Sequence, residues 1–115
     1  MKNNLFIPDE QSKELHELKC TTPFLSQSFK WFRNNHNLYH VITPFETKND
    51  VLIFAFQIFE LDSVGLTLIN IKQDFNSYEE AELECLKELI KIVQHKKINE
   101  FFDILDSKQS TDDRI

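Results

Sequence analysis

Residues 51–61, VLIFAFQIFEL, are apolar at both odd and even positions of one continuous run. In a β-strand alternate side chains point to opposite faces, so neither face of this strand would favour water. Such a run is typical of a middle strand that is covered on both sides. Helices of a small domain can cover one side. We expect the other to be covered by a further segment of the chain, a second copy or another protein.

The two faces of this strand have different expected roles. The larger apolar set, which we expect in the core, comprises Leu52, Phe54, Phe56 and Ile58. The residues of the other set that we expect to bind a partner are Ile53, Ala55, Gln57 and Phe59. His40 and Ile42 of a neighbouring strand would join them if their parity matches. The sequence alone leaves open which set faces the helices.

Helices and strands are predicted on both sides of this run. Capping residues and apolar spacing indicate helices at 9–19 and 24–35, and Thr22-Pro23 is typical of a helix start. Residues 38–43 and 66–71 have strand composition, and Pro44 fits an edge strand or the end of the first of them better than a central strand. Because the connections between the strands are short, an antiparallel meander is expected.

A long helix is the clearest predicted element of the C-terminal third. Ser77 precedes a glutamate by three residues, which is the capping-box spacing, and apolar residues then recur at helical spacing from Tyr78 to about Lys96. Residues 98–105 could add one or two turns. The element order α-α-β-β-β-α predicts a two-layer α+β fold with a three-stranded antiparallel meander and flanking helices. We expect a single domain at 1–106 and a flexible tail at 107–115.

Composition and charge narrow the classes of function. The chain has 13 Lys and Arg against 19 Asp and Glu, a formal net charge of -6. A phosphate backbone is bound mainly through Lys and Arg, so nucleic acid is not an expected partner. No run approaches the roughly 20 apolar residues that span a bilayer, and the N-terminus lacks the apolar segment of a signal peptide. We expect a cytoplasmic protein without membrane contact, in which Cys20 and Cys85 are reduced core thiols.

One alternative function is a small enzyme or metal-binding protein that uses His36, His40 and Cys20. The two histidines have His-x3-His spacing, but the paired Cys-x2-Cys half of a zinc site is absent. Residues four apart on a strand are about 13 Å apart, too far for one ion. The chain also lacks a GxSxG elbow, a phosphate-binding glycine loop and an HExxH motif. We therefore assign no catalytic residue, metal ligand or cofactor.

The last predicted helix opens with a row of carboxylates. Glu79, Glu80 and Glu84, together with Glu82 and Glu88, could imitate a row of phosphates and occupy a basic groove on a protein partner. A second alternative is a double-stranded RNA-binding domain, which has a similar order of helices and strands. The same glutamates argue against it. Such domains need a basic helix start, and this helix start is acidic.

Two short stretches, FKWFRNNHNL at 29–38 and YEEA at 78–81, resemble segments of small uncharacterised proteins of bacteriophages and other mobile elements. Phe32 stands where that group usually has an aliphatic residue. The resemblance covers about residues 24–95. It implies a mobile-element origin and brings no catalytic residues, and small accessory proteins of this kind often bind and inhibit host factors.

These patterns together predict a non-enzymatic protein-interaction module. The expected partner is a second copy in a homodimer or a host protein, and the expected surfaces are the apolar sheet face and the acidic helix face.

Overall fold

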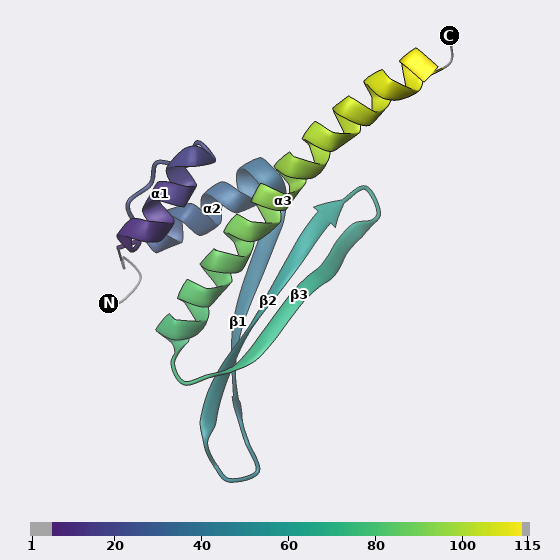
Figure 1. Cartoon of the computed structure of the whole chain (residues 1–115). Coiled ribbons are helices and arrows are strands. Elements are labelled where there is room, and N and C mark those ends of the chain that lie inside the picture. The colour runs from purple at the N-terminus through teal and green to yellow at the C-terminus, as the bar shows by residue number, and fades with distance from the viewer. Residues whose placement is uncertain (1–5, 114–115) are drawn as a thin grey trace.

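The computed structural model describes residues 6–113, with side chains placed for residues 6–105. In that part of the chain the elements are α1 (Asp9–Glu17), α2 (Leu25–His36), β1 (Leu38–Glu46), β2 (Leu52–Asp62), β3 (Gly65–Phe75) and α3 (Tyr78–Asp113). The strands form one antiparallel sheet in the order β1-β2-β3, and the helices lie together on one side of it (Figure 1). This confirms the predicted α+β fold, with the apolar run as the middle strand.

The two faces of β2 have different surroundings. Phe56 and Ile58 are fully buried and belong to the core beneath the helices. Leu52 lies at the far end of the same face and is 54% exposed, because the β1–β2 hairpin extends beyond the helices (Figure 1). The larger apolar set therefore faces the helices, as predicted, but only its central part is covered.

The core lies between this face of the sheet and the three helices. Its largest fully buried side chains are Phe32, Phe56, Leu15, Leu38, Ile58, Leu86, Leu89, Ile90 and Val93. Cys20 and Cys85 are also buried and are free thiols, in agreement with their predicted place in the core. Every element except β3 contributes a residue to the buried cluster, while Phe75 of β3 packs against its edge.

Several element boundaries differ from the prediction. The strand β1 runs past Thr43 to Glu46, and Pro44 lies inside it, opposite Phe54, in an edge strand, which is one of the two places expected for it. It is tolerated there because β1 is an edge strand, so a missing backbone donor leaves no neighbour unpaired. The start of α2 is also different, since its N-cap is Phe24, without a side-chain cap bond, in place of Thr22. The carbonyl of Pro23 instead accepts a hydrogen bond from the amide of Ile7.

The longest helix, α3, continues well past Lys96, where we expected its main part to end. Its 36 residues run to Asp113, so the backbone of 107–113, expected as a tail, is helical, and residues 114–115 lie outside the described part. No Gly or Pro follows Gly65 to interrupt it. The C-terminal half projects beyond the sheet (Figure 1). Consequently the radius of gyration is 17.5 Å, against about 13 Å for a compact domain of this length.

Ser77 caps the start of α3. Its Oγ accepts a hydrogen bond from the amide of Glu80 at 3.1 Å, the first half of the predicted capping box. We expect Ser77→Ala to lower the free energy of unfolding by about 1 kcal/mol, because a helix amide loses its partner. Urea denaturation measures this. The control is Ser63→Ala, at an exposed turn residue whose side chain has no hydrogen bond in the described structure; an equal loss there would contradict the cap.

Candidate interaction surface

The face of the sheet turned away from the helices, called the outer face below, carries no charged side chain on its paired strand residues. Its composition follows from the pairing, because residues opposite each other in an antiparallel ladder share a face. The cross-strand pairs on this face are Tyr39–Phe59, Val41–Gln57, Thr43–Ala55, Phe45–Ile53, Gln57–Ile71, Phe59–Leu68 and Leu61–Leu66. In a chain with 28% charged residues, a sheet face without charge is an unusual surface.

Large apolar side chains on the outer face are open to solvent. Their exposed fractions are 45% for Val41, 37% for Phe45, 38% for Leu61, 61% for Leu66, 46% for Leu68 and 55% for Ile71. No helix of the described chain lies on this side of the sheet (Figure 1). Solvent-facing strands normally alternate to polar residues on such a face, so its composition calls for a further explanation.

A small hollow lies in the middle of the outer face. It has a volume of about 110 Å³ and is lined by Thr43, Phe45, Ala55, Gln57, Ile71 and Gln73. Ala55 is the smallest of these side chains and is only 4% exposed, because its larger neighbours rise around it. The hollow gives the face a place for one protruding side chain of a partner.

The structure separates the residues that we expected to act together in the sheet. Ile53, Ala55, Gln57 and Phe59 share the outer face. His40 and Ile42 are on the opposite face, because they pair with Ile58 and Phe56, so they do not belong to this surface.

Sequence reasoning missed the contribution of the edge strands to the outer face. Tyr39 and Val41 of β1 alternate with the buried or half-buried residues Leu38, His40 and Ile42. This alternation places Tyr39 and Val41 together on the other face of the strand, and the sequence spacing alone could have indicated it. Leu66, Leu68 and Ile71 of β3 do not alternate evenly, because the pairing shifts between Ile58 and Phe59 and leaves an extra residue on β3.

His40 lies under α2 and lines a second hollow. Its ring stacks on Phe29 with the ring centres 3.8 Å apart. Burial, and to a smaller extent the charge of Arg33, lowers the pKa of His40 to about 4, so the imidazole is neutral at pH 7. The hollow has a volume of about 340 Å³ and is lined by Ser26, Phe29, Arg33, His40, Tyr78 and Glu82.

The residues of the metal or enzyme alternative are not assembled. His36 packs against Trp31, with the ring centres 4.9 Å apart, while Cys20 is buried beside the hydroxyl of Thr22. Within the described side chains, no group of three His, Cys, Asp or Glu residues is close enough to hold a metal ion. Burial also raises the pKa of the Cys85 thiol, which disfavours the nucleophilic thiolate.

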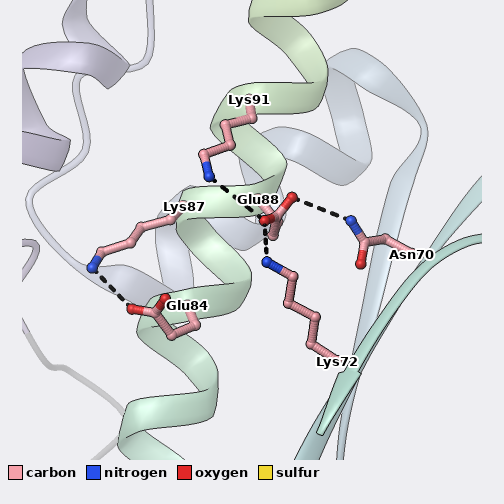
Figure 2. Close-up of polar contacts among 6 residues, drawn as sticks. All are labelled: Asn70, Lys72, Glu84, Lys87, Glu88 and Lys91. Carbon is pink, nitrogen blue, oxygen red and sulfur yellow. Dashed lines mark hydrogen bonds and ion pairs between the residues drawn. The ribbon is translucent and has the colours of Figure 1, made fainter.

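The acidic face of α3 is partly neutralised by lysines (Figure 2). Glu84 pairs with Lys87 at 2.9 Å. Glu88 turns toward the sheet, where its carboxylate accepts hydrogen bonds from Lys72 at 2.7 Å and Asn70 at 3.2 Å. Two members of the predicted row are therefore engaged within the chain.

The remaining carboxylates of the row do not form one surface either. Glu82 lines the hollow of His40, whereas Glu79 and Glu80 belong to the first turn of α3. Phosphate mimicry by a continuous row is less well supported than binding through the outer face.

Comparisons with known proteins assign no relative to this chain. No protein-family model, curated protein or solved structure matches it. A search of the described helices finds none that combines the length and the apolar character needed to cross a membrane. The function must therefore be inferred from the surfaces themselves.

Proposed function

We propose that this chain is a non-enzymatic protein-interaction module whose docking surface is the outer face of its sheet. The observation that carries the proposal is the row of exposed apolar side chains without a single charge. Three strands spaced by about 4.8 Å and up to about 36 Å long present a face of about 500 Å². Folded monomers rarely expose continuous apolar patches larger than a few hundred Å² unless the patch binds something.

The partner that fits this surface is a protein. Its flat apolar face, bordered by polar turns and containing one small hollow, has the composition of the dry centre of a protein interface. A second copy or a host protein could supply the matching surface, and a host protein agrees with an accessory role for a mobile element. The acidic start of α3 would then influence the rate of encounter more than the affinity.

The proposal is tested with charges placed on the outer face. Ile71→Glu and Val41→Glu each add a carboxylate to an exposed site of the face, so the fold should persist. We expect association with a second copy or a captured partner to weaken about 30-fold or more, the effect of losing a central apolar contact. Light scattering at several concentrations and affinity capture measure the two cases, and circular dichroism verifies the fold.

Gln27→Glu is the matched control, because Gln27 is an exposed residue of α2 on the other side of the molecule. It adds the same charge and should leave association unchanged. Unfolding of both outer-face variants would mean that this face is internal core, and unchanged association in both would mean that it binds nothing; either result rejects the proposal. Tight binding of duplex RNA at physiological salt, or stoichiometric zinc lost in His36→Ala, would favour the alternatives.

A further inference from the structure

The projecting end of α3 carries a second exposed apolar surface. Ile98, Phe101 and Phe102 are 51%, 59% and 56% exposed, and Leu105 is 39% exposed. At 3.6 residues per turn these four residues share one side of the helix, and we call them the helix stripe. They lie beyond the part of α3 that covers the sheet, so nothing in the described chain buries them (Figure 1).

The helix stripe has the spacing of a helix that docks on a surface. Its positions are i, i+3, i+4 and i+7, the anchors used by amphipathic helices that bind in a hydrophobic groove. A coiled coil would need three or four heptads of apolar residues. The stripe spans only about two turns, and the next residues, 107–110, are Ser, Lys, Gln and Ser. Helix-to-helix pairing is therefore poorly supported.

The stripe cannot reach the outer face of its own chain. α3 is one uninterrupted helix from Tyr78 to Asp113 and passes along the opposite side of the sheet. Its end points away from the sheet (Figure 1). Each molecule thus has a sheet face without a helix and a helix end without a sheet.

We infer that two copies of this chain form a reciprocal dimer in which the helix stripe of each copy packs on the outer face of the other. This inference rests on the proposed function and names its occupant as a second copy. A two-fold arrangement of this kind uses both apolar surfaces of both chains and is closed. Pairing of two outer faces, or of two stripes, would leave the other surface exposed.

Charge and shape agree with this arrangement. Each copy has a net charge of -6, but the outer face has no charge, so four apolar side chains can meet it without burying an ion. The hollow of about 110 Å³ at Ala55 is smaller than the closed cavity of about 150 Å³ that holds benzene. It can therefore receive the edge of one aromatic ring, that of Phe101 or Phe102 of the partner copy, rather than the whole ring.

The available area is also sufficient. The helix stripe limits each contact, because its four side chains are only about half exposed and so offer roughly 400 Å². One contact therefore buries at most about 800 Å² from both sides, below the usual size of a specific interface. Two such contacts approach about 1,600 Å², the standard size of a specific interface. The reciprocal arrangement therefore gains the area that a single contact lacks.

Mixing two variants tests this dimer. Phe101→Glu/Phe102→Glu removes the stripe, and Ile71→Glu blocks the outer face. We expect each variant alone to dissociate about 100-fold or more readily than the wild type, because both contacts are lost. In a 1:1 mixture the intact stripe of one chain meets the intact face of the other. That single contact should give a heterodimer weaker than the wild-type dimer, which light scattering detects at protein concentrations where neither variant associates with itself.

The matched control is Ile104→Glu, which adds a carboxylate at an equally exposed position, 58%, on a different side of the helix. It should remain dimeric. Persistence of the dimer in the stripe variant would show pairing of outer faces, and persistence in Ile71→Glu would show pairing of stripes; both overturn the inference. A wild type that is monomeric at every concentration but captures a host protein through the outer face overturns the dimer and leaves the proposed function standing.

Discussion

Phe56→Ala is expected to lower the free energy of unfolding by about 3–5 kcal/mol, the cost of replacing a large core aromatic with alanine. Phe56 has no exposed surface and stacks on Phe75, with the ring centres 5.7 Å apart. Its removal would leave a cavity where the sheet meets the helices. Because the total stability of a small domain is about 5–15 kcal/mol, the variant should lose a large part of its stability. Urea denaturation measures the loss. The dependence of the unfolding free energy on urea concentration should be the same in the variant and the wild type.

Phe45→Ala is the matched control for this prediction. Phe45 is on the outer face and 37% exposed, so truncation there should cost a monomer much less than truncation at Phe56. The comparison also tests which face of the sheet is covered. Equal losses in the two variants, measured at a concentration where the protein is monomeric, would mean that both faces are buried within one chain.

The fold could be predicted because its signals are local and agree with one another. A continuous apolar run at 51–61, bounded by polar turns, indicates a middle strand, and Ser77 with the following apolar repeat indicates the start of α3. The far end of α3 could not be predicted in the same way. Residues 98–105 keep helical spacing, but their exposed apolar side chains do not continue the side of α3 that packs on the sheet. The sequence around them does not show what these side chains contact.

The candidate surface could be predicted only in part, because both faces of β2 are apolar. Side-chain volume places Phe56 and Ile58 in the core, and the structure agrees. The parity of β1 could not be decided, since it depends on the length of the 47–51 turn, which puts His40 opposite Ile58. Pairing register is set by such turns together with the buried pattern, and a shift of one residue would reverse the faces.

The stability of the protein should fall as the pH is lowered from about 6.5 toward 4, and His40 should account for much of the fall. Burial, together with the smaller effect of the Arg33 charge, lowers the pKa of His40 from its ordinary value of 6.5 to about 4 in the folded state. The unfolded chain therefore binds the proton more tightly. The stability due to the neutral imidazole is present above pH 6.5 and is lost progressively down to the folded pKa. Linkage gives a loss of about 2 kcal/mol between pH 8 and pH 5.

His40→Gln isolates this effect from the other groups of the same hollow. Tyr78 of α3 stays neutral, because burial raises its pKa above the ordinary value. Glu82 of α3 acts in the opposite direction, because burial and Glu79 raise its pKa. We therefore expect the difference in unfolding free energy between wild type and His40→Gln to shrink by about 2 kcal/mol from pH 8 to pH 5. A constant difference over that range, measured by urea denaturation at fixed protein concentration, would mean that folding does not lower the pKa of His40.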